Sequence, residues 1–120
     1  MRPFLSIVAL LHVFFMLTEL LPWPLPFALR ITNKKLAPAD KLNPEQTKVV
    51  SNIVRNAGIY NGIVASGLFY AAFRGNSARD FALVLLVGVF AAGSFGTITL
   101  RSWLCFAQGI LGLVGWCWLR

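Results

Sequence analysis

Apolar residues along the chain gather in four long blocks, which polar or proline-rich segments separate. The blocks cover residues 4–21, 49–73, 81–100 and 103–119. A helix needs about 17 to 25 apolar residues to cross a bilayer core of about 30 Å, and each block has about that length. All four blocks are predicted to be helical, because a strand in hydrocarbon would leave backbone groups unpaired. We therefore expect an all-α fold, an integral membrane four-helix bundle that forms one domain over residues 1–120.

The connections between the blocks are of two kinds. Residues 74–79 and the turn at 101–102 are too short to do more than reverse the chain, so the last three helices are predicted to be antiparallel neighbours. The first connection, residues 22–48, is longer, basic and rich in proline. Its prolines at positions 22, 24 and 26 are expected to break any helix.

The end of this connection carries the pattern of a helix start. Asn43 is a preferred N-cap residue, Pro44 suits the first helical position, and Gln46 completes a capping box. The second helix is therefore predicted to begin here, outside the membrane, and to enter it near Val49.

A cleaved signal peptide is the alternative for the first block. Arg2 supplies a basic flank, but His12 and Glu19 interrupt the apolar run, and no small-x-small cleavage site follows. We favour a membrane span.

Composition supports a membrane protein. Apolar residues make up 58% of the chain and charged residues only 12%. These shares exclude a disordered chain and are not those of an ordinary soluble domain. The formal net charge is +7, and the bases lie between the apolar blocks instead of forming one stripe. That distribution fits a lipid bilayer as partner, and no nucleic acid partner is predicted.

The positions of the basic residues predict the orientation. Four spans place both termini on one side, together with four of the eleven bases, and the other side carries seven. The positive-inside rule then puts the 22–48 loop in the cytoplasm and both termini outside. The prediction is a multi-pass protein of the cell (inner) membrane.

Polar residues inside the blocks lie mainly toward the side of the 22–48 loop. His12 and Glu19 are two turns apart on one face of the first helix, and Trp23 would continue that face. Asn52, Asn56 and Tyr60 follow at steps of four on the second helix. Since polar groups in membranes usually face the bundle interior, we expect a ligand-binding cavity open toward the loop. Its predicted lining residues are His12, Glu19, Asn56, Tyr60, Thr97 and Gln108.

The same residues have structural interpretations. His12 and Glu19 are separated by about 10.5 Å of helix rise, so Asn56, Tyr60 or water would have to link them. Glu19 is also near enough to the basic loop for an ion pair. For Asn52, Asn56 and Tyr60 we favour interhelical hydrogen bonding over recognition. Asn61, beside Tyr60, would help to shape the cavity wall.

Stripes of small residues predict close helix packing. The second helix has Gly58, Gly62 and Ser66 every four residues. The third has Gly88, Ala92 and Gly96, and the fourth has Gly109, Gly112 and Gly115.

Four separated motifs resemble one known family. They are His12-x-x-Phe15-x-x-x-Glu19-x-x-x-Trp23, the segment 56–62, the segment 92–97 and the pair Gln108-Gly109. In this order they look like the domain of unknown function 1304 family, small four-span integral membrane proteins without an established activity. The chain departs from that pattern at Ala57, where the family usually has glutamine, and at Ile110, where a proline often follows. The resemblance implies the architecture and no activity.

The chemistry-bearing residues favour binding over catalysis. No nucleophile stands beside a histidine in a motif, so no catalytic residues are assigned. One histidine and one nearby carboxylate fall short of a zinc site, and no metal or cofactor is predicted. We expect the cavity to bind a small amphipathic or lipid-like ligand. Two alternatives stay open: a proton-coupled exporter working as a dimer, and a membrane isomerase or oxidoreductase using His12 and Glu19. A homodimer is left open in either case.

Overall fold

The structure is a computed structural model that describes residues 2–22 and 24–120. Over these residues the chain is helical and has no strand, which confirms the all-α prediction. Trp23, the residue expected to continue the face of His12 and Glu19, lies outside the described residues. The α-helices are α1 (Arg2–Leu20), α2 (Pro24–Lys35), α3 (Pro44–Arg74), α4 (Arg79–Leu100) and α5 (Trp103–Leu119), and two short 3₁₀ helices are η1 (Pro38–Asp40) and η2 (Gly75–Ala78).

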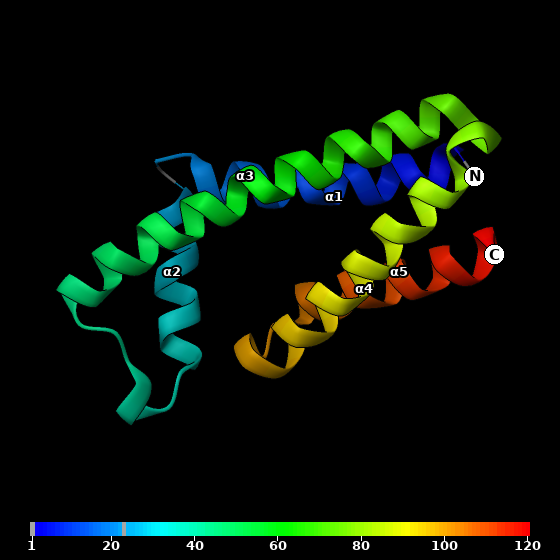
Figure 1. Ribbon diagram of the computed structural model, residues 1–120. Helices are drawn as coiled ribbons and strands as arrows, with labels where there is room; N and C mark the ends of the chain where they lie inside the picture. The colour runs from blue at the N-terminus through cyan, green and yellow to red at the C-terminus, as the bar shows by residue number, and fades with distance from the viewer. Residues whose placement is uncertain (1, 23) are drawn as a thin grey trace.

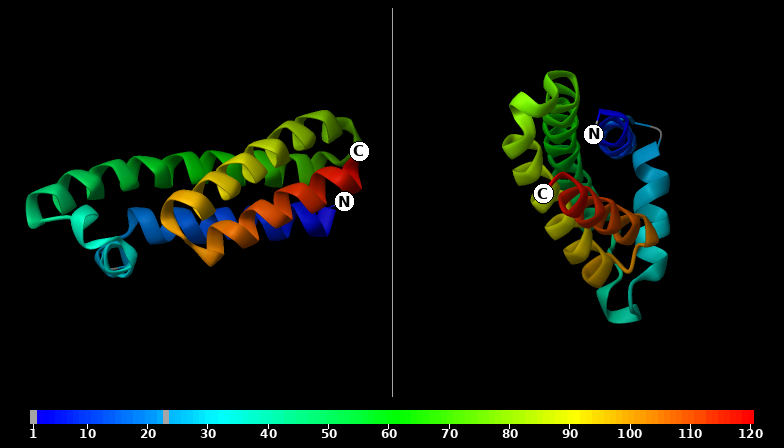
Figure 2. Two further views of the ribbon diagram at one scale, coloured as in Figure 1. Left: turned by 90° about the horizontal axis from the view of Figure 1, so that it is seen from below. Right: turned by 90° about the vertical axis from the view of Figure 1, so that its right-hand side faces the viewer.

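The helices associate in two pairs, α1 with α3 and α4 with α5 (Figures 1 and 2). Glycines bring the members of each pair together. A Cβ on Gly58 would lie 2.9 Å from Leu20 Cγ, and one on Gly62 would lie 2.8 Å from Met16 Sδ. The predicted packing role of these two glycines is confirmed, because no larger side chain fits between α1 and α3 there.

The α4–α5 pair is closer still. A Cβ on Gly93 would overlap the backbone of Gly109, and Gly112 has the same relation to Phe90. The expected stripe on α5 is therefore correct, and the one on α4 is displaced: Gly88 and Ala92 are exposed, whereas Gly93 and Gly96 are buried. A helix face that packs against a neighbour recurs at alternating steps of three and four residues, as the buried residues 86, 89, 93 and 96 do. Residues 88 and 92 lie beside this face and not on it.

Both termini and η2 lie at one end of the bundle, which we call the terminal end (Figure 1). There the Nε of Arg79 donates a hydrogen bond to the carbonyl of Leu119 at 2.6 Å, and the same guanidinium donates to the carbonyl of Arg120. The opposite end, where α1 stops, α3 starts and α4 turns into α5, is called the loop end.

An apolar core fills the half of the bundle toward the terminal end. Its buried members come from α1, α3, α4, η2 and α5, so it joins the two helix pairs. Leu5, Val8, Leu68 and Leu86 are its largest fully buried side chains.

The connection 22–48 was predicted to be a loop without a helix, and this prediction is wrong. The chain does break after Leu20, but Pro24 begins a new helix, α2, which runs across the direction of α1 and α3 (Figure 1). Prolines at positions 24 and 26 are tolerated because the first turn of a helix leaves its N–H groups unbonded anyway. Lys34 and Lys35 in the last turn suit the negative end of the helix dipole.

The predicted start of the second helix is confirmed in detail. Asn43 Oδ1 accepts from the Gln46 N–H at 2.9 Å, and Gln46 Oε1 accepts from the Asn43 N–H at 2.9 Å. Pro44 occupies the first helical turn.

Two helical stretches are long and apolar enough to cross a membrane, Arg2–Leu20 and Pro44–Leu100. The second contains α3 and α4, which η2 separates. The apolar helix α5 is shorter, with 17 residues.

Candidate functional site

Three polar side chains from α1 and α3 form one hydrogen-bonded network. The Nδ1 of His12 lies 2.8 Å from the Oδ1 of Asn61, and the Nδ2 of Asn61 donates to the Oε2 of Glu19 at 2.7 Å. The sequence required a third group to link His12 and Glu19, and that group is Asn61. Asn56 and Tyr60, the two linkers expected from α3, are both exposed.

The register of α3 explains this correction. Residues 58, 65, 68 and 72 are buried, and residue 61 follows the same alternation of three and four. Asn61 therefore faces α1, as the buried glycine beneath it does. Asn56 and Tyr60 lie about one residue around the helix, and Tyr60 is 62% exposed. The polar residues Asn52, Asn56 and Tyr60 recur at steps of four in the sequence. The residue that points toward α1 is Asn61, which follows Tyr60.

With Glu19 ionised, the network sets the proton positions on a neutral His12. An ionised carboxylate can only accept, so Asn61 turns its amino group toward Glu19 and its carbonyl oxygen toward the imidazole. The Nδ1 of His12 must then carry the hydrogen that it donates. In a neutral imidazole, the other nitrogen, Nε2, is left as an acceptor.

The Glu19 carboxylate thus accepts a hydrogen bond from the side-chain amide of Asn61 on α3. The sequence had also suggested an ion pair between Glu19 and the basic connection 22–48. Glu19 is half-buried near the end of α1. The neutral amide of Asn61 does not neutralise the carboxylate charge. Glu19 packs at the level of Gly58, where the lack of a side chain on the glycine makes room for the Cβ of Glu19.

The remaining predicted site residues are Thr97 and Gln108. The Thr97 hydroxyl donates to the carbonyl of Gly93 in its own helix at 2.7 Å. Gln108 is buried, with 7% of its surface exposed, and comes from α5. The structure therefore brings His12 and Glu19 together through Asn61, keeps Gln108 inside the bundle, and leaves Asn56 and Tyr60 on its surface.

A hollow of about 460 Å³ lies at the loop end between α1, α2 and the start of α5. None of the six predicted site residues is among its lining residues. Most of its wall is aromatic or aliphatic, and four residues add polar groups. Its lining residues are Phe14, Phe15, Thr18, Pro24, Phe27, Ala28, Ile31, Thr32, Lys35, Leu100, Ser102, Trp103 and Leu104.

The sequence did not predict this hollow, because one of its walls is α2. The prolines of the connection predict a break in any helix there, so the sequence assigns no place to Phe27, Ile31 and Lys35. The spacing of Phe27 and Ile31, four residues apart in a basic segment, is the signal that marks an amphipathic helix.

The hollow adjoins the network through Phe15. The Phe15 ring packs edge-on against His12, with centroids 6.0 Å apart and planes at 85°, and the same ring lines the hollow. His12 itself is only 2% exposed. Phe15 therefore separates the imidazole from the hollow.

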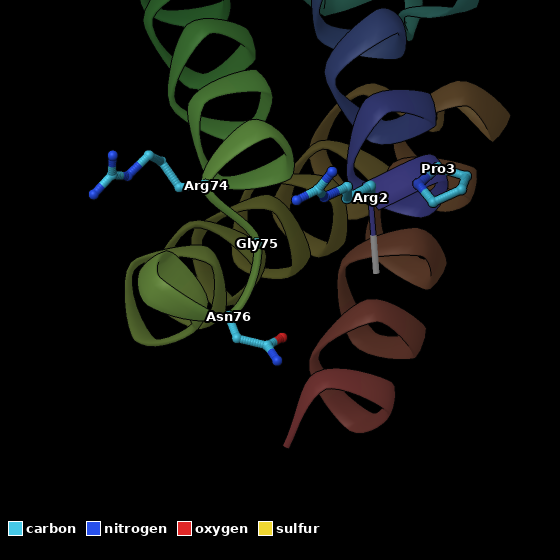
Figure 3. A pocket seen from close by; sticks show the side chains of 5 residues that line it. All are labelled: Arg2, Pro3, Arg74, Gly75 and Asn76. Carbon is cyan, nitrogen blue, oxygen red and sulfur yellow. The ribbon is translucent and has the colours of Figure 1, made fainter.

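A second hollow, of about 440 Å³, opens at the terminal end among Arg2, Pro3, Arg74, Gly75 and Asn76. Figure 3 shows Arg2 directed toward the α3–α4 turn and Arg74 directed away from it. Because the two guanidinium groups do not converge, they would not bind one anion together.

Metal-binding side chains do not gather in the part of the chain that the structure describes: no three of its histidine, cysteine and acidic residues come together. Cys105 and Cys117 are free thiols.

Comparison with known proteins places the chain in a family. Residues 6–119 match the model of the family described as protein of unknown function (DUF1304). The chain belongs to this family. The resemblance predicted from the motifs around His12, Asn56, Ala92 and Gln108 is thereby confirmed.

The comparisons with individual proteins assign no activity. The uncharacterized protein YpaA of Lactococcus lactis subsp. lactis (strain IL1403) is similar to the chain, with 29% identity over 65 residues, which cover 54% of this chain and 55% of that protein. The chain thus spans about half the length of the curated relative it matches. No solved structure matches it.

Proposed function

We propose that the chain is a four-span integral membrane protein that binds a lipid-like amphipathic ligand in the hollow at the loop end. Large apolar side chains on its outer surface support the membrane assignment. Phe73 is 82% exposed and Ile98 is 77% exposed, and exposed apolar residues occur on all four long helices. Water would disfavour so extensive an apolar surface, whereas bilayer hydrocarbon solvates it. The spans are α1, α3, α4 and α5.

The observation that carries the binding proposal is the composition of the hollow wall. A volume of about 460 Å³ lies in the usual range of small-molecule sites, which are mostly apolar with a few placed polar groups. Phe14, Phe27 and Trp103 offer surface for an apolar chain. The hydroxyls of Thr18 and Thr32 add polar contacts.

The binding proposal is preferred over its two alternatives. An exporter would need an opening at each end in turn, whereas the apolar core closes the half toward the terminal end. An isomerase or oxidoreductase gains from Asn61, which joins His12 to Glu19, but neither of these two groups lines the hollow. Binding an apolar chain in the hollow requires neither an opening at the terminal end nor a reacting group.

Trp103 makes the proposal testable by fluorescence. We would prepare a variant in which Trp103 is the single tryptophan, with Phe at positions 23, 116 and 118, and titrate it in detergent with the neutral lipid dibromostearyl alcohol. Bromine quenches indole at short range, so occupation of the hollow gives saturable quenching. The matched control keeps Trp118 alone, because it is 63% exposed at the terminal end and outside the hollow.

The account expects saturable quenching of Trp103 and only the gradual quenching of detergent partitioning for Trp118. Adding Ala28→Phe, which fills the hollow, should remove the saturable part. Equal, non-saturable quenching of both tryptophans would show that no ligand binds in the hollow.

A further inference from the structure

One buried polar atom of the network has no hydrogen-bond partner among the residues that the structure describes. The Nε2 of His12 is buried, and the protein atoms of the described residues offer it no hydrogen bond. A buried acceptor without a partner costs about 1–3 kcal/mol, so native proteins rarely keep one without a ligand or water to satisfy it. With Glu19 ionised and the imidazole neutral, Nδ1 carries the proton and donates a hydrogen bond to Asn61 Oδ1, so this nitrogen is an acceptor.

His12, which carries this nitrogen, lies one helical turn behind a residue of the hollow wall. Phe15 and Leu104 line the hollow, and His12 is one turn from Phe15 along α1. On α5, Gln108 is one turn from Leu104 in the same direction through the bundle. The two buried polar residues thus form the next layer behind the wall.

Contacts farther along α1 and α5 support this register. Phe4 and Trp118 pack edge-on with centroids 5.5 Å apart, and a Cβ on Gly115 would meet the Phe4 ring. At the loop end Phe15 shares the hollow with Leu104. The two helices are therefore antiparallel, and Gln108 lies at the depth of His12.

We propose that the ligand is a lipid alcohol, bound with its hydroxyl toward His12, and that the hydroxyl donates a hydrogen bond to the Nε2. Phe15 turns aside to admit it. The amide of Gln108 supplies a second contact to the same hydroxyl oxygen. This assignment rests on the proposed function and specifies its ligand class.

The chemistry of the site selects a neutral donor. A ketone or ester offers only acceptors, which the lone pair of Nε2 would repel. An anionic head group would approach a lone pair with the carboxylate of Glu19 behind it in the same network. A hydroxyl donates to Nε2 and keeps an acceptor for Gln108. The apolar side chains at the mouth, among them Phe14, Phe27 and Trp103, then face the tail and the bilayer.

The first test uses the fact that the chain has a single histidine. Selective ¹⁵N-histidine labelling gives one imidazole, whose two nitrogens are resolved in detergent. The probes are oleyl alcohol and 1-octadecene, which has a similar apolar chain and no hydroxyl. We expect a protonated Nδ1 and an unprotonated Nε2, and a shift of the Nε2 signal with oleyl alcohol alone. A protonated Nε2 in the neutral ring, or identical responses to the two probes, would overturn the assignment.

The second test measures affinity in variants. His12→Phe should weaken oleyl alcohol binding about tenfold, the value of one hydrogen bond, and so bring it closer to the binding of octadecene. Asn61 is a positioning residue, because its hydrogen bond to Nδ1 selects the tautomer of His12. Asn61→Leu should therefore give a mixture of the two tautomers in the ¹⁵N spectrum and weaken oleyl alcohol binding. Asn56→Leu, the matched change of an exposed asparagine on the same helix, should leave both unchanged.

The outcomes separate the two proposals. If dibromostearyl alcohol still quenches Trp103 while oleyl alcohol binds His12→Phe as well as the unchanged protein, the hollow binds lipids and the role of His12 is wrong. If neither probe binds and quenching is absent, the proposed function itself fails.

Discussion

At the scale of single residues, the polar interior of the protein depends on Asn61. This side chain forms hydrogen bonds with both His12 and Glu19 and bridges two helices that are far apart in sequence. The sequence identified both end groups of the network, because a histidine and a carboxylate in an apolar block are conspicuous. It could not identify the linker, since Asn61 and Asn56 differ only in the register of α3 on α1, which packing decides.

Replacing Asn61 should therefore be costly. Asn61→Leu removes the partner of His12 Nδ1 and of the Glu19 carboxylate, and leaving buried polar groups unpaired costs about 1–3 kcal/mol. Asn56→Leu changes an exposed position and should cost less than about 0.5 kcal/mol. Thermal unfolding of both variants in the same detergent measures the difference. Equal losses of stability would mean that the network contributes nothing to folding.

At the scale of the elements, the two helix pairs are held by backbone contact at glycines. The sequence predicted glycine packing, and α5 follows that prediction. On α4 the regular spacing of Gly88 and Ala92 was misleading, because those residues lie off the contact face. The spacing of small residues in the sequence shows where they recur on a helix. Packing against the partner helix determines which of these residues lie in the interface.

A matched pair of substitutions on α4 tests this packing. Gly93→Val would force the backbones of α4 and α5 apart, and such overpacking costs about 1–3 kcal/mol or more. Gly88→Val has nothing within 4 Å of the new Cβ. We expect a lower melting temperature for Gly93→Val only. A comparable loss for Gly88→Val would contradict the α4–α5 interface.

Helix α2 is the element that sequence analysis missed. Three closely spaced prolines suggested a loop, but two of them fall in a first helical turn, where proline removes no hydrogen bond. The consequence for function is large, since Phe27, Ala28 and Ile31 make up one wall of the hollow.

The wall formed by α2 can be tested by breaking the helix. Ala28→Pro places a proline in the middle of the segment 24–35 and should disrupt α2 at a cost of about 3 kcal/mol to that helix. The α1–α3 and α4–α5 pairs do not depend on it. We expect the saturable quenching of Trp103 to disappear while helical content, measured by circular dichroism, falls by little more than α2 contributes. Retained quenching would place the ligand elsewhere.

At the scale of the whole molecule, the bundle is divided along its length. The half toward the terminal end is filled by an apolar core, and the half toward the loop end holds the network and the hollow. The sequence predicted this asymmetry from the distribution of polar residues. It placed the cavity among six side chains in the bundle interior, and none of them lines the hollow found in the structure.

The proposed orientation predicts which end is accessible from outside the cell. In a variant with alanine at positions 105 and 117, we would place a single cysteine at exposed Asn76, at the terminal end, or at exposed Ala39, in the 22–48 connection. A membrane-impermeant maleimide added to intact cells should label position 76 and leave position 39 unlabelled until the cells are opened. Labelling of position 39 in intact cells would reverse the orientation.

The central claim is that the hollow between α1, α2 and α5 is a ligand site. The most direct measurement is an experimental structure of the protein extracted from its native membrane, with mass spectrometry of the molecules that copurify. The account predicts elongated density between Phe14, Phe27 and Trp103, with its inner end beside Phe15, and a lipid alcohol in the extract. A hollow closed by its own side chains, with no copurifying lipid, would contradict it.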